Sequence, residues 1–333
     1  QNKDEVEALY KRAYEVKRQN CGTVVYFRGI VELSNICTKN CFYCGIRKDN
    51  QSTDRYLMGK AEVLEAARWA WEQNYGSIVL QAGEREDAWY VSYVNELLQE
   101  IKTLSNSELG ITLSLGEQTE EVFRTWQESG AHRYLIRIET SNPTLYKTLH
   151  PADHSFERRL DVIRTLKKLG WQTGTGVMMG LPGQTIEDLA NDILFFYDED
   201  IDMLGMGPFI PHHDTPLKHL VQGYDGDAAL ELALKMIAAC RIALQDINIA
   251  STTALQALNP TGREMGLLAG ANIIMPNITD TKYRGNYQLY DNKPCLDENA
   301  SQCVHCLENR IASIGETVGY KEWGDSKHYQ NSR

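Results

Sequence analysis

Residues 24–44 read VVYFRGIVELSNICTKNCFYC, a strand-like run that leads directly into three closely spaced cysteines. The run from Val24 to Leu33 is rich in β-branched and aromatic side chains, which predicts a buried strand. Cys37, Cys41 and Cys44 follow with the spacing C-x3-C-x2-C. This stretch therefore predicts a strand whose following loop binds a metal.

Seven further strand-like runs alternate with helical patterns along the rest of the chain. We predict the eight strands at residues 24–33, 77–81, 110–115, 133–138, 172–179, 203–208, 247–253 and 271–275. Helices are expected at 60–73, 88–104, 117–129, 143–149, 155–169, 185–199, 227–246 and 261–269. This alternation is typical of an α/β fold, and the count predicts a closed (β/α)8 TIM barrel.

The chain has 333 residues, and no linker or repeat interrupts the alternating pattern. We predict three parts: an N-terminal helical extension at 1–22, the barrel at 23–285, and a C-terminal cluster-binding segment at 286–333. In such barrels the loops at the carboxyl ends of the strands hold the active site. The three cysteines lie in the first of those loops.

The net charge of -11 argues against a nucleic-acid partner, because binding a phosphate backbone needs a basic surface. No apolar run approaches the roughly 18 residues that a membrane span needs. The sequence begins with a charged helical pattern and has no signal-peptide core. These features predict a cytoplasmic protein without a membrane partner.

Three thiolates in one short loop can bind three corners of a 4Fe-4S cluster and leave the fourth iron open to a cofactor or substrate. The alternative is a structural zinc ion, which normally takes four closed ligands, and this loop contains no histidine. The spacing therefore favours an iron-sulfur cluster on Cys37, Cys41 and Cys44.

A second triplet, Cys295, Cys303 and Cys306, lies near the end of the chain. It can hold a second iron-sulfur cluster, and His305 also allows a zinc site, so the spacing leaves both open. Cys21 and Cys240 have no cysteine partner at ligand spacing and are expected to be buried thiols.

Polar residues recur at the predicted strand ends, where they can point into the barrel. Arg137 and Glu139 are two residues apart and therefore face the same side; they either take part in chemistry or form a structural ion pair. The other polar positions of this kind are Gln81, Glu84, Thr112, Ser114, Thr252 and Thr253.

Two loops leave alternatives open. The glycine-containing stretch 180–185 either lets an adenine or methionine group approach the backbone or forms a tight turn, with Thr185 as the N-cap of the next helix. His212 and His213 are possible metal ligands, but adjacent side chains diverge, which favours surface histidines.

The cysteine spacing, with the aromatic Tyr43 before the last cysteine, resembles the radical S-adenosylmethionine (SAM) superfamily. The resemblance implies that SAM binds the open iron and is cleaved reductively to methionine and a 5'-deoxyadenosyl radical. The segment Gln81-Ala82-Gly83-Glu84 is similar to the element of that superfamily that meets the SAM amino group. Glu139 and Arg159 resemble its polar and carboxylate contacts.

Almost the whole chain resembles the HydE family of FeFe hydrogenase maturases, relatives of biotin synthase. The similarity lies in the blocks FRGIVELSNICTKNCFYCGIR, LQAGE, ITLSLGE, RYLIRIET, GLPGQT, GPFIPHHDTPL, STTA and GANIIMPNITDTKYRGNYQLY. One departure is Ile138, where relatives often have histidine.

The HydE resemblance implies assembly of the hydrogenase diiron subsite, with a cysteine-bound iron complex carrying CO and cyanide as substrate. It implies an electron donor such as flavodoxin or ferredoxin, other maturation proteins as partners, and an accessory 2Fe-2S or 4Fe-4S cluster on the late cysteines. Arg137 would hold an anionic substrate. The residues expected to border SAM or the lumen are Ser114, Thr252, Thr253, Met275 and Tyr287.

Two alternatives remain from the sequence. The first is a HydE paralogue or a biotin-synthase-like radical SAM enzyme of sulfur chemistry. The second is a metal-binding or redox-sensing protein without catalysis, for which the cysteines alone would suffice.

Overall fold

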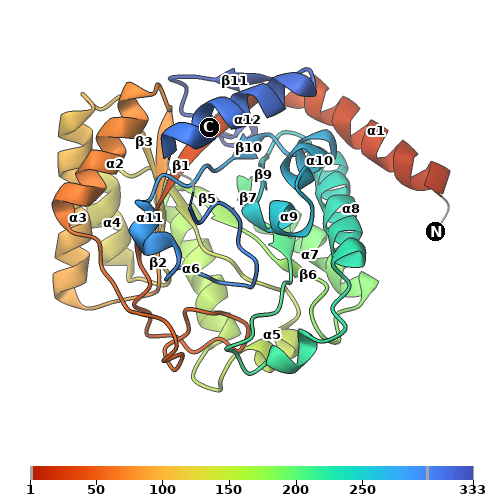
Figure 1. Ribbon diagram of the computed structural model, residues 1–333, viewed down its shortest axis with the longest axis horizontal. Helices are drawn as coiled ribbons and strands as arrows, with labels where there is room; N and C mark the ends of the chain where they lie inside the picture. Colours follow the sequence, from red (N-terminus) through yellow and green to blue (C-terminus); the bar gives the residue numbers. More distant parts are fainter. Residues whose placement is uncertain (1–2, 298–299, 333) are drawn as a thin grey trace.

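A closed barrel of eight parallel strands forms the centre of the computed structural model, which describes residues 3–297 and 300–332, with only the backbone for residues 300–305 (Figure 1). Each strand pairs with its neighbour in sequence order, and the pairing of the last with the first closes the barrel. The predicted (β/α)8 barrel is confirmed. Its strands are β1 (Val24–Ser34), β2 (Ser77–Ala82), β3 (Gly110–Ser114), β4 (Arg133–Leu135), β5 (Gln172–Thr175), β7 (Met203–Leu204), β9 (Asn248–Ser251) and β10 (Ile273–Ile274).

Helices surround the barrel, and several begin at a capping side chain, such as Asp87 before α3 and Ser155 before α6. The helices are α1 (Lys3–Asn20), α2 (Lys60–Glu72), α3 (Ala88–Leu104), α4 (Glu120–Glu128), α5 (Pro143–Leu149), α6 (Phe156–Leu169), α7 (Ile186–Asp198), η1 (Lys218–Leu220), α8 (Gly226–Leu244), α9 (Thr253–Leu258), α10 (Gly262–Leu268), α11 (Thr281–Arg284), α12 (Ala300–Ser313) and α13 (Lys327–Asn331). Among the described residues, no helix is long and apolar enough to cross a membrane.

Two predicted strands are each divided in the structure. The run 172–179 forms β5 and β6 (Met178–Met179), and the run 203–208 forms β7 and β8 (Gly207–Pro208). The break comes where Gly176 and Gly205 cross, because a Cβ on Gly176 would lie 2.3 Å from the Gly205 carbonyl oxygen. β6 and β8 then pair only with each other, beyond the ends of β5 and β7.

Most other boundaries differ from the prediction by a few residues, and three of the differences have a clear local cause. β4 ends at Leu135, three residues early, because the backbone N–H of Ile138 donates to the Thr175 hydroxyl instead of a strand partner. α4 starts at Glu120, since Thr119 is its N-cap. The segment after β9 turns into the unpredicted helix α9 at Thr253.

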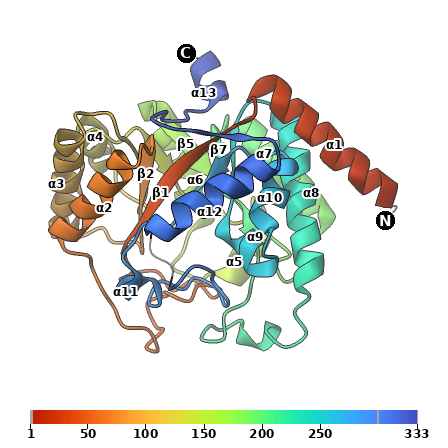
Figure 2. The same ribbon diagram turned by 45° about the horizontal axis from the view of Figure 1, so that its top comes forward.

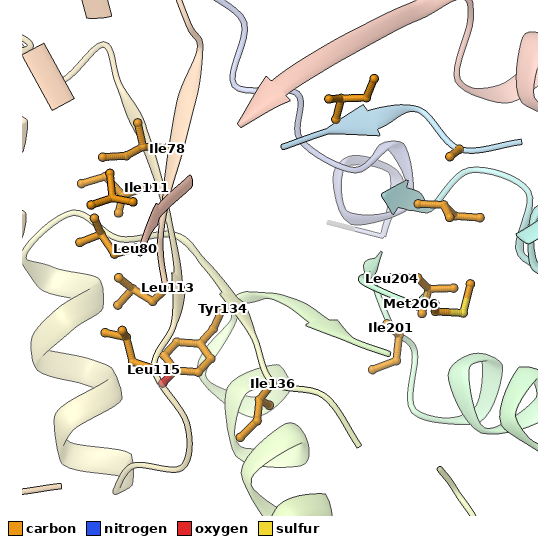
Figure 3. Packing of buried hydrophobic residues seen from close by; sticks show 14 of the residues in the cluster. Ile78, Leu80, Ile111, Leu113, Leu115, Tyr134, Ile136, Ile201, Leu204 and Met206 are labelled. Carbon is orange, nitrogen blue, oxygen red and sulfur yellow. The ribbon is translucent and has the colours of Figure 1, made fainter. Parts of the chain in front are cut away.

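Side chains alternate across the barrel wall. Ile78 and Leu80 of β2 and Ile111 and Leu113 of β3 point outward and pack against the helices, together with Leu115 (Figure 3). The intervening residues of the same strands face the interior. The lumen is therefore lined partly by polar side chains while the outer layer forms the hydrophobic core.

The end of the barrel opposite the cysteine loop is closed by the C-terminal residues before α13, which Figure 2 shows on the far side of the barrel from α11. The Gly324 carbonyl accepts hydrogen bonds from Arg28 (2.9 Å) and Asn248 (2.8 Å) inside the barrel. Asp325 accepts from Arg133 at 2.6 Å. Another C-terminal piece, β11 (Thr317–Gly319), pairs with the start of β1. The domain boundaries at 22/23 and 285/286 stay predictions.

The N-terminal helix is fastened to the C-terminal segment by a fully buried ion pair. The Lys17 ammonium donates to both carboxylate oxygens of Glu316, at 2.6 and 2.8 Å, and to the Leu267 carbonyl at 3.1 Å. Neither charged side chain has any exposed surface. Each ion therefore depends on the other for compensation of its charge.

We expect Lys17→Met to lower the free energy of unfolding by about 3 to 5 kcal/mol, because it leaves the Glu316 carboxylate buried and uncompensated. Urea denaturation measures this loss, and the double variant Lys17→Met/Glu316→Leu should recover most of it. Arg124→Met, which breaks the exposed pair with Glu120, is the control and should cost less than about 1 kcal/mol. Equal losses in the two single variants would contradict this account.

Candidate active site

The cysteine loop after β1 is held by backbone hydrogen bonds from three other parts of the chain. Thr38 donates to the Glu84 carbonyl at 2.9 Å, Phe42 to Leu149 at 2.9 Å, and Gly45 to Leu289 at 3.0 Å. The loop therefore has a defined shape although it contains no helix or strand.

The side chain of Arg55 organises the far half of this loop from within. Its guanidinium donates to the carbonyls of Asn35 (2.6 Å), Ile46 (2.8 Å), Arg47 (2.6 Å) and Asn50 (2.7 Å). Sequence reasoning missed Arg55, because an arginine shortly after the cysteines carries no signal of such a role.

Cys37, Cys41 and Cys44 are free thiols, and burial raises the pKa of all three. The charge of Cys37 raises the pKa of Cys41, and Cys41 and Cys37 together raise that of Cys44. A bound cation removes this penalty. Two backbone N–H groups, from Glu84 at 3.3 Å and Lys39 at 3.4 Å, already point at the Cys37 sulfur. The donor set therefore fits a thiolate-bound metal group.

The spacing of these sulfurs distinguishes a cluster from a single ion. Ligands of one tetrahedral zinc lie about 4 Å apart, given a Zn–S bond of about 2.3 Å. The three cysteine sulfurs are not all within 4.8 Å of one another, since in the described part of the chain only His212, His213 and Asp214 meet that criterion. The wider spacing fits the corners of a 4Fe-4S cluster.

Gly83 lets the end of β2 touch the cysteine loop. A Cβ at this position would lie 2.4 Å from the Ile36 carbonyl oxygen and 2.8 Å from the Cys37 Cβ. Its own N–H donates to the Ser34 carbonyl at 2.9 Å. The end of β2 at Ala82 and Gly83 is thus next to the cysteine loop, but neither residue lines the cavity described below, and their contact with SAM stays a prediction.

Glu84 and Arg159 lie in a buried charge network beside the same loop. Lys39 contacts Glu84 at 3.0 Å and Glu117 at 3.2 Å, and Arg159 donates to Glu117 at 2.7 Å and to the Arg137 carbonyl at 2.8 Å. Although burial opposes charge on Glu117, Arg159 and Lys39 lower its pKa to about 2. Burial instead raises the pKa of Glu84. Neither Glu84 nor Arg159 lines the cavity.

A cavity of about 290 Å³ occupies the barrel lumen next to Cys44. Most of the residues expected around SAM or substrate line it, from five different strands or the loops after them. These are Tyr43, Ser114, Arg137, Glu139, Thr252, Thr253, Met275 and Tyr287.

Glu139 has an unusual backbone for a non-glycine residue, with φ at 67°. Its N–H donates to the Gly176 carbonyl, and its own carbonyl accepts from Met178, both at 3.0 Å, which hold this conformation. The carboxylate lies 2.9 Å from the Arg137 guanidinium and accepts from the Tyr43 hydroxyl at 3.3 Å. Strained backbone of this kind is concentrated at functional sites.

Ile138, between Arg137 and Glu139, is fully buried in the hydrophobic core and does not line the cavity. The side chain at this position therefore packs in the outer layer of the barrel and not in the lumen.

Four charged or polar residues of the cavity were missing from the predicted site. Arg28 and Glu32 lie on β1, and Tyr290 and Lys293 come from the segment before the late cysteines. Charged residues inside a buried strand were a signal for the first two. Tyr290 and Lys293 could not be placed, because that segment has no regular structure.

The stretch 180–185 forms a turn and does not line the cavity. The side-chain oxygen of Gln184 accepts from the backbone of Gly180 at 2.8 Å and Leu181 at 3.2 Å. Thr185 is the N-cap of α7, accepting from the backbone N–H of Asp188.

His212 and His213 form a hydrogen-bonded cluster with two aspartates. His213 Nδ1 lies 2.6 Å from Asp291, and His212 Nδ1 accepts the backbone N–H of Asp214 at 3.0 Å. A neutral ring that accepts at Nδ1 carries its proton on Nε2, which then cannot bind a metal. His212 Nε2 is therefore excluded as a ligand, and the contact of His213 with Asp291 makes His213 a hydrogen-bonding group as well.

The late triplet is only partly described. Cys295 and Cys306 border a small cavity of about 70 Å³ together with Arg263 and Arg310. The side chains of Cys303 and His305 lie outside the described residues. A second cluster on these cysteines stays a prediction.

The sequence is similar to proteins of known family. Residues 31–196 match the radical SAM superfamily. The FeFe hydrogenase maturase subunit HydE of Thermotoga maritima is 47% identical over 322 residues, covering 96% of this chain and 89% of that protein. The 3-methylornithine synthase of Methanosarcina acetivorans is 26% identical, covering 86% and 79%.

Two solved structures share the fold. The structure of methylornithine synthase superposes with a TM-score of 0.81 at 24% identity, covering 96% of this chain and 91% of that one. The maturase HydG of Carboxydothermus hydrogenoformans gives a TM-score of 0.79 at 20% identity, covering 96% and 73%. With the cysteine loop and the lumen as described, and with nearly half of its residues identical to HydE along almost its full length, this chain belongs to the HydE family of radical SAM hydrogenase maturases.

Proposed function

We propose that the protein cleaves SAM at a 4Fe-4S cluster on Cys37, Cys41 and Cys44 and uses the resulting radical to assemble the diiron subsite of FeFe hydrogenase. The observation that carries this proposal is the position of Cys44 on the wall of a charged lumen, in a chain 47% identical to HydE. When bound, the cluster and SAM supply a 5'-deoxyadenosyl radical by one-electron cleavage of a carbon-sulfur bond.

The protein's own contribution is to bind, orient and shield. The three cysteines hold three corners of the cluster, and Ala82, Gly83 and Glu84 bring the end of β2 against it. We assign Tyr43, Ser114, Glu139, Met275 and Tyr287 to the SAM side of the lumen, and Arg159 to the network that supports it.

Arg137, Thr252 and Thr253 are assigned to the substrate. The planar guanidinium of Arg137 offers paired N–H donors to an anionic group. We propose a cysteine-bound iron complex that carries CO and cyanide as substrate. The closed floor of the barrel keeps bulk water from the lumen on that side.

The predicted partners fit this reaction. An electron donor such as flavodoxin or ferredoxin would reduce the first cluster, and other maturation proteins would deliver the substrate or accept the product. An accessory 2Fe-2S or 4Fe-4S cluster on Cys295, Cys303 and Cys306 and a cytoplasmic location stay predictions.

Two cysteine variants should separate the roles of the two cysteine triplets. In anaerobically reconstituted protein reduced with dithionite, Cys41→Ala should abolish formation of 5'-deoxyadenosine, because only two cluster ligands remain in the first loop. Cys303→Ala should retain it. Product is quantified by chromatography against wild type. If Cys41→Ala retained cleavage, the radical SAM proposal would fail.

The contact of Gly83 with the cysteine loop can be tested directly. Gly83→Ala should displace the cysteine loop and lower both iron content and SAM cleavage at least about tenfold, since ångström-scale misplacement has effects of this size. Iron per protein and 5'-deoxyadenosine are the readouts. Gly285→Ala is the matched control, because no atom lies within 4 Å of a Cβ there. Full iron content in Gly83→Ala would rule out the proposed role of this contact.

A conservative variant tests Arg137 as a substrate residue. Arg137→Lys keeps the charge and removes the planar fork, so hydrogenase maturation should fall more than SAM cleavage does. We expect the 5'-deoxyadenosine formed per matured hydrogenase to rise about tenfold, in line with a lost charge-assisted hydrogen bond. A parallel loss of both activities would instead assign Arg137 to SAM. Cleavage of SAM without any maturation by wild type would favour the biotin-synthase-like alternative.

A further inference from the structure

One ion pair in the lumen has no role in the function proposed above. It joins Glu32, on the lumen face of β1, to Lys293, in the segment 286–293, which we call the mouth strap. The Lys293 ammonium donates to one Glu32 oxygen and, at 2.7 Å, to the Tyr287 carbonyl. Both side chains line the cavity and are at least nine-tenths buried.

The mouth strap is fixed against the cysteine loop and the loop after β8. The Asn286 carbonyl accepts from the Asn35 side chain at 2.7 Å, and the Leu289 carbonyl accepts from Gly45. The Asp291 N–H donates to the Pro211 carbonyl at 3.4 Å. These three hydrogen bonds hold the mouth strap in place, so the ion pair of Lys293 with Glu32 is not needed for that purpose.

The hydrogen-bonding capacity of this pair is incomplete. The second Glu32 oxygen is buried and has no partner among the described residues. Lys293 can donate three hydrogen bonds, and among the described residues two acceptors are in reach, with the ring of Tyr287 5.1 Å from the ammonium. Buried charged groups are normally fully hydrogen-bonded. The unused capacity of this pair therefore either destabilises the fold or serves to bind a ligand.

A second buried pair in the same protein shows what a purely structural arrangement looks like. Lys17 contacts both oxygens of Glu316 and one carbonyl, so all three of its donors and both carboxylate oxygens are used. Among the described residues, Glu32 and Lys293 instead leave one carboxylate oxygen without a partner and one N–H donor with only the Tyr287 ring nearby, and both side chains line the cavity. The two pairs differ in just the capacity that a ligand would fill.

We propose that Glu32 and Lys293 form a subsite for the zwitterionic head group of an α-amino acid. A primary ammonium would donate to the free Glu32 oxygen, and the adjacent carboxylate would accept from Lys293. A simple anion would be repelled by Glu32, and a simple cation by Lys293. The pair therefore selects a ligand that carries both charges, and Arg137, Thr252 and Thr253 remain for the rest of the substrate.

This inference rests on the proposed function, since it assigns a cysteine-derived substrate its head-group contacts. It is tested by binding alone, in anaerobic protein with oxidised cluster and saturating SAM. The probe is S-methyl-L-cysteine, whose capped sulfur is a poor iron ligand. Two analogues lack one charge each: 3-(methylthio)propionate has no amine, and 2-(methylthio)ethylamine has no carboxylate. Affinities are measured by isothermal titration calorimetry.

Wild type should bind S-methyl-L-cysteine at least about tenfold more tightly than either analogue, as expected for a charge-assisted hydrogen bond. Glu32→Gln should weaken the amino acid and the amine but not the propionate. Lys293→Met should weaken the amino acid and the propionate but not the amine. Glu32→Asp and Lys293→Arg should restore part of the selectivity.

The matched controls are Glu62→Gln and Lys282→Met. These residues form an ion pair of the same type, with Lys282 also 4.9 Å from the ring of Tyr283, but on the surface. They should change none of the three affinities. Melting temperature and iron content of every variant show whether the fold and the clusters are intact.

The proposal is overturned if wild type does not bind S-methyl-L-cysteine. It is also overturned if each variant lowers the affinity for all three compounds equally, because an ion pair that only holds the mouth strap in place would give that result. It is also overturned if SAM affinity falls more than amino-acid affinity, because the pair would then belong to the SAM site. Failure of the proposed function is distinguishable, since it is decided by 5'-deoxyadenosine formation in Cys41→Ala and wild type.

Discussion

The register of β1 is the constraint on which the rest of the structure depends. This strand pairs with β2, β10 and β11, so it closes the barrel and attaches the C-terminal segment. Arg28, Ile30 and Glu32 alternate along it and all face the lumen. A shift by one residue would turn these three outward and bring Val31 and Leu33 inside. It would also move the start of the cysteine loop relative to Gly83.

Much of the fold could be predicted because the strands of a parallel barrel are apolar and separated by helices with clear caps. α3 and α5 have the predicted bounds for this reason. The splitting of the runs 172–179 and 203–208 could not be predicted, since it results from the contact of Gly176 with Gly205, which are distant in sequence. α9 was missed because Thr252 and Thr253 are β-branched and directly continue the run of β9, which is equally compatible with a longer strand.

The candidate site divides in the same way. Cys37, Cys41 and Cys44 follow from spacing, and Arg137 and Glu139 follow from the two-residue period of a strand. The residues that surround them could not be predicted. Arg55, Lys39 and Glu117 contact carbonyl and carboxylate groups that come close only in the folded chain. Lys293 could not be placed at all, because its position in the lumen depends on backbone contacts of the mouth strap with Gly45 and Asn35.

The closure of one end of the barrel by Gly324 and Asp325 has a consequence for the order of events. With that end closed, a ligand reaches the described part of the lumen from the opposite end, where Cys44 and Tyr43 line the cavity. A molecule that occupies the depth of the lumen must enter before that opposite end is filled, and it leaves only after the occupant of that end has gone. Geometry thus imposes a sequence of arrival and departure on two ligands that never need to recognise each other.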